Sequence, residues 1–244
     1  MAKVDLTVVI PTWNEAGNIE KALSSTTEVL EKAGISYEIL VMDDRSTDGT
    51  DRIVNGFSRR KPGVSFIAHA PPPGFGYSIR DGIRMAKGEA VAVMMADLSD
   101  DPSFLPGMLA RVMEGCDVVV GSRFLQGSKI YDYPPLKYIS NRLFNLSVQL
   151  CFLSGINDTS NAFKMFRTAL IRGMPVDSRG FTVSAEMMLR MKIAGHRICQ
   201  VPVTWSDRTE GQAKFRLSNT FYNYFILLMR MVKLAYIDSV FKGR

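Results

Sequence analysis

Short apolar runs and amphipathic stretches alternate along the first half of the chain. The apolar runs have the length of strands, and the stretches between them repeat apolar side chains at helical spacing. This alternation predicts an α/β fold with a mostly parallel central sheet flanked by helices. We expect strands at residues 6–10, 37–42, 64–68, 90–95 and 117–121, with Pro11 ending the first. We expect helices at residues 16–33, 47–60, 79–87 and 104–113.

The second half of the chain is less regular. Its expected elements are an amphipathic stretch from Pro134 and Pro135 to about residue 153, a helix at residues 180–194 and a strand at residues 197–205. Pro202 lies in that strand. Because proline cannot donate to a ladder, we place the strand at an edge of the sheet.

The last stretch, residues 217–240, is rich in aromatic and aliphatic side chains. Polar and charged residues interrupt it, so no uncharged run reaches the roughly 18 to 20 residues of a membrane span. We therefore expect one domain over residues 1–216, followed by an amphipathic helix over residues 217–244. That helix would pack on the domain or associate with a membrane.

Polar side chains follow several of the expected strands at the point where each strand ends. They are Asn14, Glu15, Asp43, Asp44, Asp97, Ser122 and Arg123. The carboxyl ends of parallel strands meet at one edge of a sheet, and open α/β sheets bind ligands at that edge. The pattern therefore predicts a ligand site there.

Composition and charge narrow the class of protein. The chain has 244 residues, 46% of them hydrophobic and 22% charged, which is typical of a globular protein with one large domain or two small ones. The net charge of +6 favours an anionic partner such as a nucleic acid, a nucleotide phosphate or a membrane surface. Charge alone does not choose among these partners.

The cysteines indicate the redox compartment. Cys116, Cys151 and Cys199 are far apart and lack CxxC or CxxH spacing. We therefore expect neither a disulfide framework nor a zinc site, and a reducing compartment fits this usage best. The N-terminus enters a strand-like run with no preceding apolar segment and cleavage site, so secretion is not expected.

Two acidic segments carry the candidate chemistry. The first, DDRSTDGT at residues 43–50, can accept hydrogen bonds from a base or sugar, hold a metal, or cap the helix that follows. The second is MADLSDDP at residues 95–102. In it, Asp97 with Asp100 or Asp101 offers hard oxygen ligands for Mg²⁺ or Mn²⁺ carrying a diphosphate. Alternatively, Asp100 and Asp101 favour the N-terminus of a helix through its dipole.

These two segments, together with VVIPTWNE at residues 8–15, resemble the family 2 glycosyltransferases. Within that family, further segments resemble the dolichol-phosphate mannosyltransferases and the bacterial polyprenyl-phosphate glycosyltransferases. They are GFGYSIRDG at residues 74–82, AKGE at 86–89, GSRF at 121–124, DTSNAFK at 158–164, and VPV, DR and GQAK between 201 and 214. The resemblance runs from about residue 5 to about residue 216.

The resemblance implies a GT-A fold, a single α/β domain that binds a nucleoside-diphosphate sugar of the GDP-mannose or UDP-glucose type and Mg²⁺ or Mn²⁺. It also implies inversion at the sugar carbon. Carried over by position, the nucleotide-sugar site comprises Pro11, Asn14, Glu15, Asp43, Asp44, Arg80 and Asp97. The metal site comprises Asp97, the surviving member of the DxD motif, with Ser99, Asp100 or Asp101. The residues nearest the reacting groups are Asp97, Asp158, Arg123, Arg208 and Lys214.

The chain departs from the family pattern at four positions. Met95 replaces the first Asp of DxD, and a thioether is a poor ligand for hard cations. Either Asp97 holds the metal with its neighbours, or metal dependence is weaker than in the family. Asn161, Lys164 and Ala213 replace a Gly, an Arg and a Ser, which bears on acceptor or sugar specificity more than on the fold.

The expected acceptor is a polyprenyl or dolichyl phosphate. A phosphate monoester is ionised near neutral pH, so it needs cations such as Arg123, Arg208, Lys214 and Lys164 rather than a base. A hydroxyl acceptor on a glycan or small molecule needs a carboxylate base, for which Asp158 is the leading residue if it does not form a loop turn. A non-catalytic subunit that binds nucleotide sugar is the third alternative.

An enzyme whose acceptor is a lipid must act at a membrane surface. Residues 136–153 and 221–241 mix apolar side chains with Lys and Arg, as helices in the headgroup region do. The alternative is that both stretches pack on the sheet or in a dimer interface. We expect a cytoplasmic protein, peripheral on the cytoplasmic face of a membrane, with a membrane-anchored subunit or a second copy as a further partner. Nucleic acid is not an expected partner.

Overall fold

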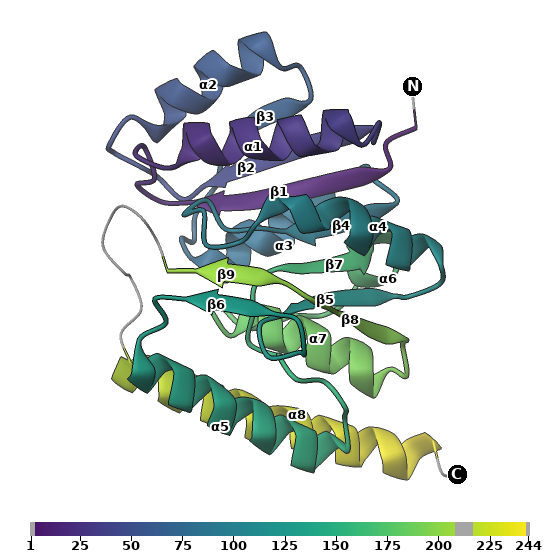
Figure 1. The fold of residues 1–244 in the computed structure, drawn as a ribbon. Coiled ribbons are helices and arrows are strands. Elements are labelled where there is room, and N and C mark those ends of the chain that lie inside the picture. The colour runs from purple at the N-terminus through teal and green to yellow at the C-terminus, as the bar shows by residue number, and fades with distance from the viewer. Residues whose placement is uncertain (1–2, 208–216, 243–244) are drawn as a thin grey trace.

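A seven-stranded sheet forms the centre of the computed structural model, which describes residues 3–207 and 217–242 (Figure 1). The strand order is β3-β2-β1-β4-β7-β5-β8. The strands are β1 (Leu6–Thr12), β2 (Tyr37–Asp43), β3 (Val64–Ala68), β4 (Ala90–Val93), β5 (Val118–Ser122), β7 (Lys164–Arg167) and β8 (Ile198–Pro202). Only β7 is antiparallel to its neighbours, β4 and β5. The predicted α/β fold with a mostly parallel sheet is confirmed.

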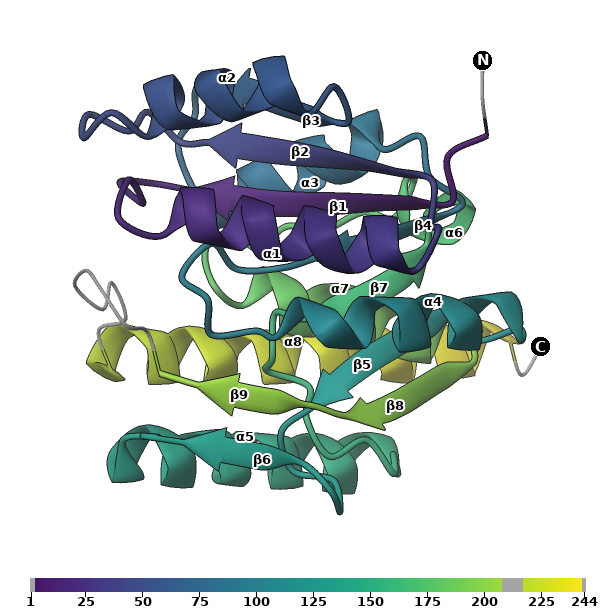
Figure 2. The same ribbon diagram turned by 45° about the horizontal axis from the view of Figure 1, so that its top comes forward.

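Helices cover both faces of this sheet (Figure 2). They are α1 (Ile19–Lys32), α2 (Thr50–Arg60), α3 (Phe75–Met85), α4 (Leu105–Met113), α5 (Pro135–Phe152), α6 (Thr168–Ile171), α7 (Val183–Ile193) and α8 (Leu217–Lys242), with a 3-10 turn, η1, at Pro102–Phe104. Successive residues of β1 point to opposite core layers. Val8 belongs to the layer that includes α1, α2 and α4, and Val9 to the layer that includes α3, α7 and α8.

The two longest helices, α5 and α8, lie side by side next to the part of the sheet formed by β5 and β8 (Figure 1). Buried Phe144 and Val148 of α5 and Leu227 of α8 belong to one apolar cluster with α7. The rings of Phe144 and Tyr224 pack with centroids 4.6 Å apart. Within residues 3–207 and 217–242, none of the helices combines the length and apolar character that crossing a bilayer requires.

The end of β1 differs from the prediction. Pro11 does not end the strand, because β1 continues to Thr12 and stays in register with β2 as far as Asp43. On its other side, β1 pairs with β4 only as far as Val9. No strand there needs a hydrogen-bond donor from Pro11, so the proline is tolerated inside the element.

The later strands of the chain also differ from the prediction. The expected strand at residues 197–205 divides at Val203 into β8, at the edge of the main sheet as predicted, and β9 (Thr204–Ser206). β9 pairs instead with β6 (Lys129–Tyr131) in a separate two-stranded sheet. β7 had no predicted counterpart, although it stands between β4 and β5.

The expectation of no disulfide is wrong. Cys116, just before β5, and Cys199, in β8, form a disulfide with Cα atoms 6.0 Å apart. β5 and β8 are adjacent parallel strands, and this pairing unites cysteines 83 residues apart in the sequence. Spacing along the chain detects local motifs only, so it does not reveal a pair made by strand neighbours. Cys151 is a free, exposed thiol.

Candidate functional site

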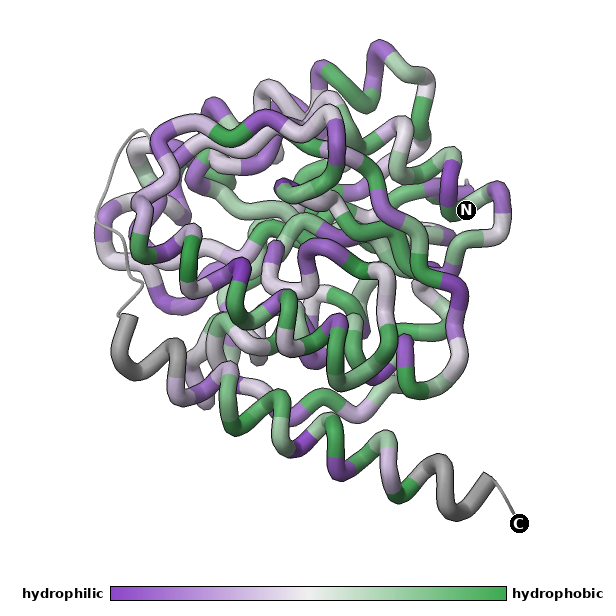
Figure 3. The backbone as a smooth tube through the Cα atoms, turned by 60° about the horizontal axis from the view of Figure 1, so that its bottom comes forward, coloured by the Kyte–Doolittle hydropathy of each residue, from purple (hydrophilic) through white to green (hydrophobic). Residues whose placement is uncertain are grey.

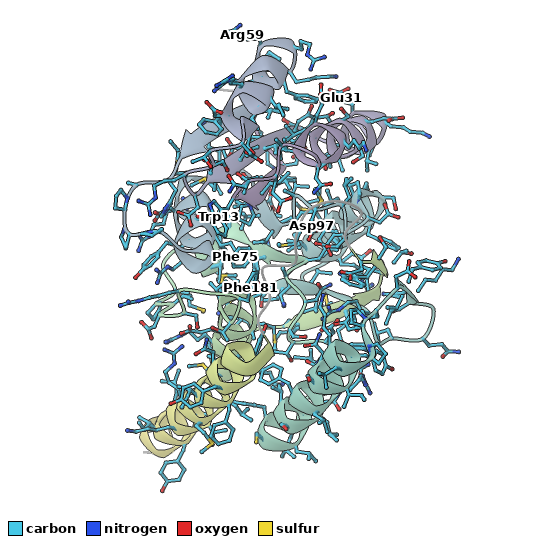
Figure 4. The ribbon with its side chains drawn as sticks, turned by 90° about the vertical axis from the view of Figure 1, so that its left-hand side faces the viewer. Trp13, Glu31, Arg59, Phe75, Asp97 and Phe181 are labelled. Carbon is cyan, nitrogen blue, oxygen red and sulfur yellow. A yellow bond between two sulfur atoms is a disulfide. The ribbon has the colours of Figure 1, made fainter. Side chains whose placement is uncertain are left out.

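A pocket of about 480 Å³ opens at the carboxyl ends of β1, β2 and β4. This is the edge of the sheet at which the sequence predicts a ligand site. Trp13, Phe75, Asp97 and Phe181 are among its lining residues, and Figure 4 labels them in a view onto this side of the molecule. Other walls come from the loop after β5, α5, the loops before β7 and α7, β9 and α8. The volume is within the usual range for small-molecule sites.

Three of the predicted nucleoside contacts line this pocket: Pro11, Glu15 and Asp44. Glu15 Oε2 accepts a hydrogen bond from Asn18 Nδ2 at 3.0 Å. Asp44 Oδ2 accepts one from the Gly74 N–H at 2.9 Å. Asp44 Oδ1 is buried and has no hydrogen-bond partner among the described residues. That oxygen lies 4.0 Å from His69 Nδ1.

The other two, Asn14 and Asp43, are not in the pocket lining. Asp43 is 3% exposed and accepts hydrogen bonds from the Ser46 N–H at 2.9 Å and the Thr12 hydroxyl at 3.1 Å. Asn14 Oδ1 accepts one from the Thr47 N–H at 2.8 Å. Both side chains therefore fix the loops after β1 and β2, and a direct nucleoside contact by either stays a prediction.

The four predicted metal ligands all lie in the segment after β4, but only two of them line the pocket. Asp97 and Ser99 line the pocket, and the Ser99 hydroxyl donates to Asp97 Oδ1 at 2.7 Å. Asp100 turns inward, is 3% exposed and accepts the Met95 N–H at 3.3 Å. Burial, reinforced by the charge of Asp97, raises the pKa of Asp100 to about 7. Asp101 caps η1 by accepting the N–H of residue 103 at 2.9 Å. Asp100 and Asp101 thus hold the backbone of this segment and lie outside the pocket lining, and their role as metal ligands stays a prediction.

A divalent cation fits this segment with few protein ligands. Within the described ranges, no three His, Cys, Asp or Glu side chains converge as a metal site. Mg²⁺ often takes one or two protein carboxylates and completes its shell with water and substrate phosphate oxygens. Asp97, with the Ser99 hydroxyl beside it, supplies that minimum. The donor set therefore fits Mg²⁺ or Mn²⁺ that arrives with a diphosphate.

A buried ion pair supports the wall of the pocket after β5. Arg123 Nε lies 2.7 Å from Asp158 Oδ2, and Arg123 Nη2 lies 2.9 Å from Asp158 Oδ1. Burial opposes both charges, but the pairing outweighs it, so the pKa of Asp158 is lowered and that of Arg123 is raised. Arg123 lines the pocket, whereas Asp158 is fully buried and does not. Its contacts position Arg123 at the pocket wall, and a role for Asp158 as a base at the reaction centre stays a prediction.

Lys164 is not a pocket cation either. It is fully buried in β7 and donates hydrogen bonds to the backbone carbonyls of Thr159, at 3.1 Å, and Asn161. Burial lowers the pKa of Lys164 to about 7, even though the Asp158 charge acts in the opposite direction. Lys164 therefore fixes the loop before β7 from a buried position, and a role in guiding the acceptor stays a prediction.

Arg80 lies outside the pocket lining as well. Its guanidinium donates to the Val176 carbonyl and stands 4.4 Å from the centroid of the Tyr77 ring. It lines a separate cavity beside residues 171–177, and its proximity to the donor stays a prediction. Arg208 and Lys214 lie outside the described residues.

Several pocket residues were not predicted from the sequence. Lys137 and Asn141 reach the pocket from α5, and Trp205 reaches it from β9. The Lys137 ammonium lies 4.7 Å from the centroid of the Trp205 ring and 3.9 Å from a carboxylate oxygen of Asp207. In the sequence, Lys137 stands among apolar side chains. This pattern predicts an amphipathic helix, but it does not indicate that the helix borders a cavity.

The charges of the pocket are divided between its walls. The carboxylates of Glu15, Asp44 and Asp97 follow β1, β2 and β4, whereas the cations Arg123, Lys137 and Arg179 line the other walls, together with one carboxylate, Asp207. This separation of charge suits the simultaneous binding of two ligands. The first is a diphosphate with its divalent cation, which would face the carboxylates. A second anionic group would then meet Arg123 and Lys137.

Two proteins of known name are similar to this chain over most of its length. A dolichol-phosphate mannosyltransferase of Pyrococcus furiosus is 29% identical over 230 residues, which cover 93% of this chain and 64% of that protein. The chain thus spans less than two thirds of that relative. An undecaprenyl-phosphate mannosyltransferase of Micrococcus luteus is 27% identical over 212 residues, which cover 84% of this chain and 85% of that protein.

Solved structures share the fold. A glucosyl-3-phosphoglycerate synthase of Mycobacterium tuberculosis, in complex with Mn²⁺, UDP and glucosyl-3-phosphoglycerate, has a TM-score of 0.71 at 17% identity, over 94% of this chain and 80% of that one. With Mn²⁺, UDP and phosphoglyceric acid, the same enzyme gives 0.72 at 18% identity, over 94% and 78%. The family model named Glycosyl transferase family 2 matches residues 7–173, more than half of the chain. The protein therefore belongs to glycosyl transferase family 2 and has the GT-A fold.

Proposed function

We propose that this enzyme transfers a hexose, with inversion, from a nucleoside-diphosphate sugar to a polyprenyl or dolichyl phosphate, using Mg²⁺ or Mn²⁺. The observation that carries the proposal is the division of charge in the pocket, with Asp97 on one side and Arg123 and Lys137 on the other. The names of two relatives combine mannosyl transfer with dolichol phosphate and undecaprenyl phosphate. They support a lipid phosphate as acceptor and make mannose the first sugar to test.

The donor occupies the side of the pocket formed by β1, β2 and β4. When bound, the divalent cation neutralises charge on the departing nucleoside diphosphate. Asp97 holds that cation, with the Ser99 hydroxyl fixing the carboxylate at 2.7 Å. Asp44 Oδ1 and Ser78 Oγ are buried, line this side and have no hydrogen-bond partner in the described ranges. We assign them to the nucleoside or the sugar, which would reach them after a small shift of the surrounding side chains.

The transfer is a single displacement at the anomeric carbon, C1. An oxygen of the acceptor phosphate forms a bond to C1 while the bond from C1 to the diphosphate oxygen breaks. The nucleoside diphosphate leaves with the electron pair of that bond. The acceptor is largely ionised near neutral pH, so no carboxylate base is needed and the burial of Asp158 is no obstacle. Arg123, held by Asp158, and Lys137 orient the acceptor phosphate and offset its charge.

We assign the side formed by α5 and α8 to a membrane surface. Figure 3 turns this side forward and shows apolar residues, in green, along both helices. Each of the following side chains is at least 50% exposed: Leu136, Ile139, Leu143, Leu146, Leu150, Tyr222, Phe225, Met229 and Tyr236. Arg142 and Lys233 are exposed on the same helices, and such mixed faces gain from the anionic headgroups of the cytoplasmic leaflet. The pocket borders both helices through Asn141 and Tyr224, so a lipid phosphate reaches it from this surface.

A transfer assay tests the proposed reaction. Radiolabelled GDP-mannose, UDP-glucose or UDP-GlcNAc is supplied with a short polyprenyl phosphate in Mg²⁺, Mn²⁺ or chelator, and label is counted in the organic phase. We expect label from one donor, and its loss with chelator. If label appeared only on a water-soluble hydroxyl acceptor, the lipid acceptor would be rejected in favour of a glycan or a small molecule. Binding of nucleotide sugar without transfer to any acceptor would favour a non-catalytic subunit.

Vesicle binding tests the membrane surface. Leu150→Glu places a charge on a side chain that is 70% exposed in α5, and we expect it to weaken binding to anionic vesicles by about tenfold or more, because a buried apolar contact is lost. Ser24→Glu on α1 is the matched control, since it adds the same charge on another face. Equal vesicle binding by both variants would contradict the assignment. A dimer that only Leu150→Glu dissociates would assign the face to a second copy instead.

A further inference from the structure

A short segment before α7, residues 177–181, separates the pocket from a second cavity of about 300 Å³. We call this segment the strap. Arg179, Gly180 and Phe181 line both cavities, and α8 forms the opposite wall of the second one. The strap therefore lies between the candidate active site and the helix that we assign to the membrane surface.

One side of the strap is anchored to α7 and α8. Glu186, fully buried in α7, accepts hydrogen bonds from the N–H of Asp177 at 3.1 Å and of Ser178 at 2.7 Å. The same carboxylate lies 2.8 Å from Arg190 Nε and 2.7 Å from Arg230 Nη2 of α8. Because one carboxylate makes all these contacts, the start of the strap is fixed relative to both helices.

The other side of the strap lies against the beginning of α3. The Gly76 N–H donates to the Arg179 carbonyl at 2.8 Å. A Cβ at Gly76 would stand 2.3 Å from the Ser178 carbonyl oxygen, so this close approach requires glycine. The rings of Phe75 and Phe181 pack with centroids 4.9 Å apart. The strap backbone is thus held between α3, α7 and α8.

The side chain of Arg179 contrasts with this fixed backbone. It is exposed, and the described part of the chain gives it neither a hydrogen bond nor an ion pair. The other two cations of the pocket face carboxylates: Arg123 meets Asp158 at 2.7 Å, and Lys137 lies 3.9 Å from Asp207. Arg179 therefore brings an uncompensated positive charge to the pocket. Its planar fork of N–H donors matches phosphate oxygens, and the fixed backbone reduces the entropy lost on binding.

We propose that Arg179 binds the phosphate group of the lipid acceptor, together with Arg123 and Lys137. The inference rests on the proposed function and adds a residue to its acceptor site. Phosphate reaches the pocket from two sources, the acceptor and the diphosphate of the donor. We assign Arg179 to the acceptor phosphate because the strap also faces the cavity beside α8. Ile226 of α8, the helix that we assign to the membrane surface, lines that cavity and is 46% exposed. The donor side is instead marked by the carboxylates after β1, β2 and β4.

Steady-state kinetics of Arg179→Gln test the proposal. Glutamine removes the charge without removing a contact within the described chain, so the fold should persist. We expect KM for a short polyprenyl phosphate to rise about tenfold or more, because a charge-assisted hydrogen bond is lost. KM for the nucleotide sugar should stay within about twofold. Arg179→Lys should recover part of the loss, since lysine restores the charge but not the fork.

Arg59→Gln is the matched control. It removes another exposed arginine from α2, far from the pocket (Figure 4), and should leave both KM values unchanged. A rise in the donor KM alone in Arg179→Gln would assign the arginine to the diphosphate and overturn the proposal. Equality with the wild type in both values would also overturn it.

A binding measurement separates this proposal from the proposed function. A short polyprenyl phosphate is titrated into the enzyme without donor, so no transfer is needed. Weaker binding by Arg179→Gln than by Arg59→Gln supports the contact even if the wild type transfers sugar to another acceptor. Equal binding by the two variants rejects the contact even if the transfer assay succeeds.

Discussion

Replacement of Asp97 by asparagine is expected to lower kcat by about a hundredfold to a thousandfold, the usual cost of losing a group that stabilises developing charge. Asp97 is the carboxylate of the segment after β4 that reaches the pocket. Asparagine keeps the shape and still accepts the hydrogen bond from Ser99, but it removes the negative charge that a cation-bound diphosphate needs. Initial rates over a range of Mn²⁺ concentrations measure the loss, and the melting temperature reports on the fold.

Asp101→Asn is the matched control for this prediction. Asp101 lies four residues further along, caps η1 and is not in the pocket lining. Asparagine caps a helix about as well as aspartate, so both kcat and stability should be retained. Wild-type kcat in Asp97→Asn, or an equal loss in Asp101→Asn, would show that the cation is not held at Asp97.

The largest effect on stability is expected from Asp158→Ala, which should lower the free energy of unfolding by about 3–5 kcal/mol. The substitution leaves the Arg123 guanidinium, 6% exposed, without its carboxylate, and Lys164 loses the same compensating charge. Urea unfolding measures the change. Activity should fall as well, because Arg123 loses the two side-chain hydrogen bonds that orient it toward the pocket.

The pH dependence of unfolding gives an independent check on the same pair. The folded pKa of Asp158 is lowered relative to that of an unfolded chain, which is about 4. Its contribution is therefore complete above that pH and is lost as the pH falls through the lower, folded value. Asp158→Ala should lose less stability on acidification than the wild type.

Glu114→Ala provides the contrast to the buried pair. Glu114 meets Arg111 at 3.0 Å, but their side chains are 59% and 49% exposed. Exposed pairs of this kind contribute at most about 1 kcal/mol, so the expected loss is small. If Asp158→Ala were no less stable than Glu114→Ala, the buried pair would not anchor the wall after β5.

The parallel part of the sheet could be predicted because its strands are covered on both faces. A strand such as β4, all four of whose residues are buried, appears in the sequence as an uninterrupted apolar run. β7 could not be predicted in this way. It has only four residues and begins with Lys164, whose buried ammonium is satisfied by carbonyls of the preceding loop. Nothing in the local pattern indicates such a partner.

The candidate site was predicted only as far as strand ends determine it. Glu15, Asp44, Asp97 and Arg123 line the pocket because each follows a strand of the sheet. The sequence does not separate Asp97 from the two aspartates just after it, since direction depends on backbone shape, including the positive φ of 61° at residue 98. The residues of α5, β9 and the strap reach the pocket because of tertiary packing. The periodicity of hydrophobic residues along the chain does not predict such packing.

The position of β7 also imposes an order on folding. Ala90 of β4 pairs with Arg167 of β7, and Val118 of β5 pairs with Phe166, so one short strand joins two parts of the sheet. During synthesis, β1 to β4 emerge first and leave β4 as an open edge until residues 164–167 have left the ribosome. An open edge pairs readily with other chains. Insertion of β7 closes that edge, and a long-range pairing of this kind is slow to form. The nascent half-sheet is therefore the species in which this protein is most exposed to aggregation.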